Sequence, residues 1–152
     1  MATIKTRFTT MLGVKYPVMQ EGLGPYKTVH LAAAVSNAGG LGTVSIPGIS
    51  EIPEVGAAKL RDYIEQACAL TNLPFAVNIP VGTDKHGDVP PFSKAYVVAV
   101  VDAVKDNEIA KRLRVITISV TLGPSKKVCT GRTWVCPPAA LKMAADLLPR
   151  SH

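Results

Sequence analysis

The chain has 152 residues, of which 47% are hydrophobic and 18% charged, so it has the length of one ordinary domain and the composition of a globular one. No apolar run approaches the roughly 18 to 20 residues of a membrane span, and the amino terminus carries no apolar segment of a secretion signal. We therefore expect a cytoplasmic protein with no membrane partner.

The formal net charge of +6 is unevenly distributed along the chain. Residues 1–120 hold 12 Lys and Arg against 10 Asp and Glu, a net of +2, and residues 121–152 hold 5 against 1, a net of +4. Basic charge alone is a weak sign of nucleic-acid binding, and no zinc knuckle, aromatic-interleaved basic stripe or recognition-helix pattern accompanies it. We expect no nucleic-acid partner.

The three cysteines are Cys68, Cys129 and Cys136. An odd count without a secretion signal predicts reduced thiols. Cys68 lies in a helical pattern and is expected to be a small core residue. Cys129 and Cys136 have no His or Cys partner at metal-ligand spacing, so we expect no metal site.

The chain is organised around a compact βαβ unit over residues 16–45. Its predicted parts are a strand at 16–20, a glycine-rich turn at 21–24, an alanine-rich helix at 31–38 and a strand at 41–45. Gly39 and Gly40 end the helix, because glycine accepts the positive φ that a helix C-terminus usually needs. A βαβ unit implies a parallel sheet with a right-handed crossover.

The segments around this unit continue the alternation of helix and strand. Apolar residues three and four apart predict an amphipathic helix over 55–71, and the uninterrupted apolar run that follows is typical of a parallel strand buried on both faces. The further predicted elements are a lead-in helix at 7–12, strands at 75–81 and 114–120, a polar loop at 82–91, and helices at 93–103 and 106–113. The sequence therefore predicts an α/β fold of four βα repeats.

Four segments of this pattern resemble the nitronate monooxygenases, FMN enzymes formerly called 2-nitropropane dioxygenases. They are Lys5–Thr9, Leu12–Pro17, Leu31–Gly42 and Pro74–Pro80, and the resemblance runs from about Lys5 to about Ser119. It implies TIM-barrel-like (β/α) repeats that form approximately the N-terminal half of a (β/α)8 barrel, with the lead-in helix closing the bottom of the barrel.

Beyond Val120 the composition changes and the resemblance ends. We expect a partial TIM-barrel flavin-binding domain over 1–120 and a basic tail of divergent sequence over 121–152. The family would continue with four further βα units, so the resemblance implies a truncated form. A shift of reading frame, or a junction with other sequence, near Val120 is our hypothesis for this change.

The turn that follows the first predicted strand is the first candidate site. Only small residues such as Gly22 and Gly24 allow the backbone to approach a flat cofactor closely, although the same pattern is typical of any tight βα turn. A dinucleotide-binding fingerprint is disfavoured because Lys27 stands at the third glycine position. The resemblance implies that the turn lies against the flavin; the family commonly has a small residue where this chain has Glu21.

Asn78 is the second candidate, because an amide within an apolar strand is costly unless it is hydrogen-bonded. It could instead be a satisfied core residue bonded to a neighbouring loop. The resemblance assigns the matching asparagine to FMN. The cofactor-binding residues that we expect are therefore Met19, Gln20, Glu21, Gly22 and Asn78.

No catalytic residue is expected among the histidines. His30 starts a helix and reads as a surface or cap residue, His86 lies in a loop from which it could face a substrate, and His152 is the chain terminus. By resemblance, the family's catalytic histidine lies beyond the matching region.

The resemblance implies an FMN-dependent oxidoreductase that oxidises an alkyl nitronate with O2 to a carbonyl compound and nitrite. A related flavin-dependent enoyl reductase is the first alternative. The second is a non-catalytic half-barrel remnant or oligomerisation module, since open edges at the first and fourth strands would seek partners and a homo-oligomer could close a barrel.

Overall fold

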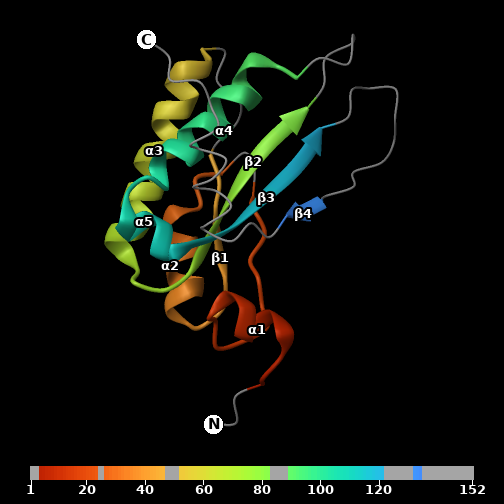
Figure 1. Ribbon diagram of the computed structural model, residues 1–152, viewed down its shortest axis with the longest axis vertical. Helices are drawn as coiled ribbons and strands as arrows, with labels where there is room; N and C mark the ends of the chain where they lie inside the picture. The colour runs from red at the N-terminus through yellow and green to blue at the C-terminus, as the bar shows by residue number, and fades with distance from the viewer. Residues whose placement is uncertain (1–3, 24–25, 47–51, 83–88, 122–131, 135–152) are drawn as a thin grey trace.

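The computed structural model describes residues 4–23, 26–46, 52–82, 89–121 and 132–134, and shows helices and a mostly parallel sheet (Figure 1). The helices are α1 (Arg7–Leu12), α2 (Val29–Asn37), α3 (Pro53–Leu70), α4 (Pro91–Ala103) and α5 (Asn107–Arg112). The strands are β1 (Gly42–Val44), β2 (Phe75–Gly82), β3 (Leu113–Thr121) and β4 (Arg132–Trp134). The predicted α/β class and parallel sheet are confirmed. Within these described residues, no helix is both long and apolar enough to span a bilayer.

The sheet has the order β1-β2-β3-β4, with parallel pairing among the first three strands. The predicted strand over 16–20 is reduced to one parallel bridge between Met19 and Leu41. The Leu41 N–H donates to the Val18 carbonyl at 2.9 Å, and the Leu41 carbonyl accepts from the Gln20 N–H at 2.9 Å. This segment still runs beside β1, in the place of a first strand.

The outer edge of β3 differs from the sequence expectation. The strand was expected to leave an open edge, but β4 pairs with it in the antiparallel direction from Ile116 to Ile118. Residues 132–134 of the predicted tail therefore join the sheet, so the expectation of an open edge is wrong over these three residues. A further βα unit of a barrel would have brought a parallel strand to the same edge.

Helix α1 lies at the end of the sheet where β2 and β3 begin (Figure 1). It starts with a reciprocal capping box, in which the side chains of Thr6 and Thr9 each accept from the other residue's N–H. It ends at Gly13, whose φ of 70° closes the last turn in the left-handed conformation.

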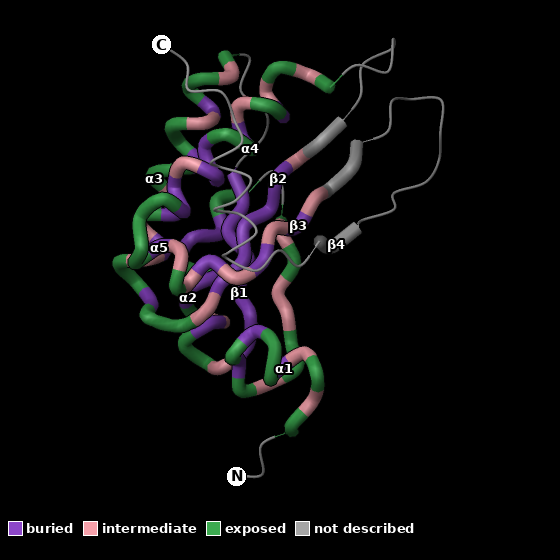
Figure 2. Tube along the Cα trace, in the orientation of Figure 1, coloured by how far each residue is buried: buried purple, intermediate pink, exposed green. Residues whose placement is uncertain are grey.

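Side chains alternate between two cores because successive strand residues point to opposite faces. Helices α2 to α5 cover one face, where β2 contributes Phe75, Val77 and Ile79 to the main core (Figures 1 and 2). The opposite face carries a smaller apolar cluster of Leu12, Val14, Leu41, Ala76 and Val115. The fold thus separates a helix-covered face from a second face that α1 and the chain around Met19 line.

Cys68 packs against the main core from α3 and is half-buried, so the prediction of a core position holds in part. Its burial raises the pKa of the thiol, which the nearby Arg112 guanidinium opposes. Cys129 and Cys136 lie outside the described residues.

The contact between α3 and α4 depends on Gly56. A Cβ at this position would lie 2.4 Å from Oη and 2.6 Å from Cε1 of Tyr96, whose side chain is fully buried. Helix propensity alone would make Gly56→Ala stabilising by about 1 kcal/mol. We expect the opposite, a loss of about 1–3 kcal/mol from overpacking, measured by urea denaturation. Ala58→Gly on the exposed side of α3 reports the propensity term separately, and a stabilised Gly56→Ala variant would contradict the packing argument.

Candidate functional site

A polar layer lies on the sheet face opposite the helices, directly beyond the smaller apolar cluster. Leu41, Ala76 and Val115 belong to that cluster. Two residues further along each strand, on the same face, come Thr43, Asn78 and Thr117. All three are buried, with exposed fractions of 0%, 8% and 2%. Asn78 and Thr117 pair with each other and form the polar layer beyond Ala76 and Val115, whereas Thr43 pairs with Ala76 and lies one layer nearer the start of the strands.

Asn78 is hydrogen-bonded within the sheet. Its Nδ2 donates to Thr117 Oγ1 at 2.9 Å and approaches the Thr117 carbonyl oxygen at 3.5 Å. The two residues are direct partners in the register of β2 and β3. The structure therefore identifies Thr117 as the neighbour that holds the Asn78 amide.

The turn after the first strand segment packs directly on Asn78. A Cβ on Gly22 would lie 2.6 Å from Asn78 Cβ and 2.8 Å from its Cγ, which real side chains do not allow. Gly22 has no positive φ, so close approach and not backbone conformation requires glycine here. The structure thus brings together Gly22 and Asn78, two predicted site residues that are 56 positions apart in the sequence.

Gln20 connects this turn to β1. Its Oε1 accepts from the Thr43 N–H at 3.0 Å, and its Nε2 donates to the Glu21 carbonyl. The Glu21 side chain is exposed, and its Oε1 accepts from the Gly22 N–H at 3.1 Å. The carboxylate therefore folds back on its own turn, beside the Gly22 backbone.

Met19 lies below the polar layer. It is half-buried and packs against the smaller apolar cluster, next to its bridge partner Leu41. Its contribution to a site is an apolar wall rather than a polar contact.

Thr43 carries an orphaned polar atom. Among the described residues, its Oγ1 and the Nε of Arg114 are the buried side-chain nitrogen or oxygen atoms without a hydrogen-bond partner. A buried hydroxyl without a hydrogen-bond partner costs about 1–3 kcal/mol of stability, so such a group in a native fold is a candidate for a functional role. Sequence reasoning missed both Thr43 and Thr117, although counting two positions on from the apolar layer would have found them.

The remaining candidates lie elsewhere. His30 is exposed on α2, as expected for a surface residue, and the N-cap of that helix is Thr28. His86 and His152 lie outside the described residues. No group of three or more His, Cys, Asp and Glu side chains that could hold a metal ion occurs in the described part of the chain.

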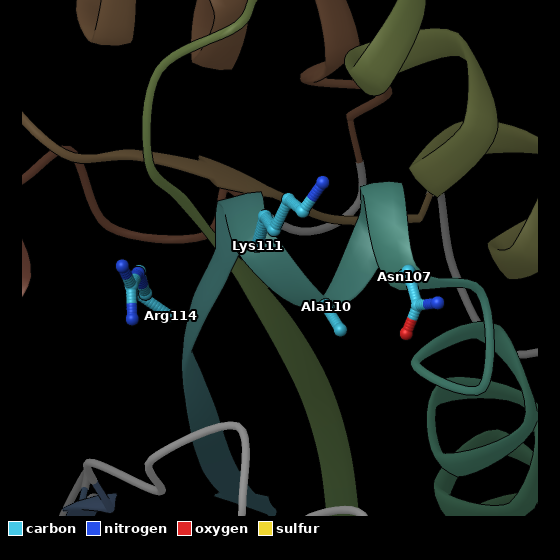
Figure 3. A pocket seen from close by; sticks show the side chains of 4 residues that line it. All are labelled: Asn107, Ala110, Lys111 and Arg114. Atoms are coloured by element: carbon cyan, nitrogen blue, oxygen red, sulfur yellow. The ribbon is translucent and has the colours of Figure 1, made fainter.

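A pocket of about 370 Å³ lies at the junction of α5 and β3, lined by Asn107, Ala110, Lys111 and Arg114 (Figure 3). It opens beside the start of β3, at the end of the sheet opposite to that where α/β enzymes place their sites. Lys111 Nζ pairs with Glu108 at 2.6 Å, and this hydrogen bond holds the pKa of Glu108 below its usual range. Figure 3 shows Arg114 well apart from Asn107 and Ala110, so the lining does not converge on one point. No predicted site residue lines this pocket.

The fold and the site thus define an α/β protein with a glycine turn packed on a polar layer of parallel strands. The family model for nitronate monooxygenase matches residues 5–130, and the chain belongs to that family. The match extends beyond Val120, where the resemblance was expected to end; the division into a domain over 1–120 and a tail over 121–152 stays a prediction.

Curated relatives match the amino-terminal part. A probable nitronate monooxygenase of Staphylococcus saprophyticus is 43% identical over 82 residues, which are 54% of this chain and 21% of the relative. A nitronate monooxygenase of Pseudomonas aeruginosa is 44% identical over 73 residues, 48% of this chain and 19% of the relative. The chain therefore matches about a fifth of the length of these relatives.

Solved structures of FabK from Thermotoga maritima are similar in fold. One matches with a TM-score of 0.55 and 30% sequence identity, covering 76% of this chain and 30% of FabK. An M276A mutant of the same protein matches with a TM-score of 0.56 and 29% identity.

Proposed function

We propose that the chain is the amino-terminal part of an FMN-dependent nitronate monooxygenase, which oxidises alkyl nitronates with O2 to a carbonyl compound and nitrite. The observation that carries the proposal is the contact of Gly22 with Asn78 beside the polar layer, in a chain of this family. The residues proposed to bind the flavin are Met19, Gln20, Glu21, Gly22 and Asn78.

The described residues fit a flat, partly polar cofactor. Gly22 exposes backbone without a side chain, Asn78 adds an amide, and Met19 adds apolar surface. The unpartnered hydroxyl of Thr43 is on the same face of the sheet, beside Ala76 and one layer nearer the start of the strands than Asn78. Bound FMN would supply the redox chemistry, whereas these residues bind and orient the ring.

No described residue is assigned the removal of a proton from the substrate. His30 is exposed on α2 and is not part of the polar layer. The proposal therefore places only one wall of the site on this chain, as in approximately the N-terminal half of a (β/α)8 barrel. The rest of the barrel, or a second copy of the chain, would have to supply the base and the phosphate anchor. The cytoplasmic compartment and the absence of nucleic-acid partners stay predictions.

Two alternatives remain. The solved structures that match carry the name FabK and not that of the curated relatives, so the reaction of a related flavin-dependent enoyl reductase is the second candidate. A non-catalytic half-barrel that pairs with another chain is the third candidate. Because β4 already pairs with β3 from Ile116 to Ile118, that part of the edge is not open to a second chain.

The deciding experiment is the visible absorption of the purified protein with added FMN, followed through a sizing column. A perturbed flavin spectrum that elutes with the protein supports the flavin site, and the elution volume shows whether one copy or two hold it. Turnover of an alkyl nitronate against that of an enoyl thioester then separates the two enzymes. Flavin that elutes separately from the folded protein would contradict the proposal.

Glu21 should lower the reduction potential of the bound flavin, because a negative charge disfavours added electrons. Glu21→Gln keeps the acceptor for the Gly22 N–H and removes the charge. For an exposed charge, we expect the two-electron potential to rise by roughly 5–20 mV. Dye-equilibration titration of the flavin measures the shift. Glu54→Gln on α3 is the control, and a lower potential for Glu21→Gln would contradict the placement of Glu21 beside the ring.

A further inference from the structure

The side chain of Thr117 holds the Asn78 amide. It is 2% exposed, and its Oγ1 lies 2.9 Å from Asn78 Nδ2. We propose that Thr117 is a positioning residue that fixes which end of the Asn78 amide faces the flavin, an inference that rests on the proposed function.

The orientation of the amide follows from the second contact. The Thr117 carbonyl oxygen lies 3.5 Å from the same amide end, and a carbonyl oxygen can only accept a hydrogen bond. The end of the Asn78 amide that faces Thr117 must therefore be the NH2 group. A valine at position 117 would remove the 2.9 Å hydrogen bond that selects that end and leave the Thr117 carbonyl at 3.5 Å.

The opposite end of the amide is on the turn side. Asn78 Oδ1 would lie 3.2 Å from a Cβ placed on Gly22, so the oxygen is next to the turn that is proposed to touch the ring. An amide oxygen has two lone pairs and accepts from N–H groups. The flavin group that the Asn78 amide oxygen would contact is accordingly a hydrogen-bond donor. The donor on the oxidised flavin ring system is its imide N–H at N3.

The test compares FMN with N3-methyl-FMN, in which the imide donor is replaced by a methyl group. Dissociation constants are measured by quenching of flavin fluorescence for the wild type, Thr117→Val and Thr117→Ser. Thr71→Val is the matched control, because Thr71 Oγ1 donates to Asn37 Oδ1 at 2.7 Å in a Thr–Asn pair outside the proposed site. The ratio of the two dissociation constants is a readout that mere loss of stability would not move.

We expect the wild type and Thr71→Val to bind FMN about tenfold more tightly than the methylated flavin, since about tenfold is a typical effect of one hydrogen bond. Thr117→Ser should keep that ratio, and Thr117→Val should lower it. If Thr117→Val does not fold, Thr117→Ala serves in the same comparison.

The outcomes separate the two ideas. A wild type that binds both flavins equally, or a Thr117→Val variant that keeps the wild-type ratio, overturns the role of Thr117 and leaves the flavin site standing. A wild type that binds neither flavin overturns the proposed function, and the role of Thr117 falls with it.

Discussion

Gly42→Ala should cost at least about 3 kcal/mol in the free energy of unfolding, at the upper end of the cost of overpacking. A Cβ on Gly42 would lie 1.9 Å from the carbonyl oxygen of Ala32, 2.5 Å from its carbonyl carbon and 2.6 Å from its Cα. All three atoms are backbone of α2, so no side-chain rotation relieves the clash. Because a domain is stable by only about 5–15 kcal/mol, such a loss is a large fraction of the total free energy of unfolding. Urea denaturation followed by circular dichroism measures the loss.

The control for Gly42 is Gly13→Ala. Gly13 has a φ of 70°, and its nearest contact for a Cβ is Pro74 Cγ at 3.9 Å, so the added methyl group has space there. That variant should lose about 1–2 kcal/mol, the cost of a left-handed residue with a side chain. If the free energy of unfolding of Gly42→Ala differs from that of the wild type by less than about 1 kcal/mol, α2 does not lie as close to β1 as the structure places it. Soluble yield gives the same comparison if the variant does not fold.

The helices and buried strands were predictable from local signals. The predicted helix over 55–71 is α3, Pro53–Leu70, because its apolar residues recur on one helical face. The predicted strand over 75–81 is β2, Phe75–Gly82, because an unbroken apolar run between turn residues suits a parallel strand covered on both faces. Such signals lie within the element itself and need no knowledge of its neighbours.

The failures concern partners that are distant in the chain. The strand expected over 16–20 shrinks to a bridge because the N–H groups of Lys15 and Tyr16 both donate to the Gly39 carbonyl, which takes the start of the segment out of the ladder. The antiparallel β4 follows from a tertiary pairing that the composition of a basic tail does not reveal.

The site was predictable in part. Residues with a local sequence signal could be found, whereas those placed by the register of neighbouring strands could not. Gly22 and Asn78 carry local signals, a glycine turn after a strand and an amide in an apolar run, and the structure brings them into contact. Thr117 has no such signal, because threonine is common in strands. Its place beside Asn78 is set by the register of β2 against β3.

Gly22→Ala should weaken FMN binding by at least about tenfold, which corresponds to about 1.4 kcal/mol. The added Cβ would lie 2.6 Å from Asn78 Cβ, so either the turn lifts from β2 or the Asn78 amide leaves Thr117. Both movements change the wall that is proposed to face the ring. The free protein should lose little stability, because Gly22 lies in a half-exposed turn and has no positive φ. The melting temperature without flavin and the dissociation constant of FMN measure the two effects separately.

Val18→Ala is the matched control, since Val18 is in the same segment with 59% of its surface exposed and should leave the affinity unchanged. A Gly22→Ala variant that binds FMN as tightly as the wild type would remove the turn from the proposed site. Equal losses in both variants would mean that the whole segment, and not the close approach at Gly22, governs binding. A loss confined to Gly22→Ala ties flavin affinity to the close contact of Gly22 with Asn78 of β2.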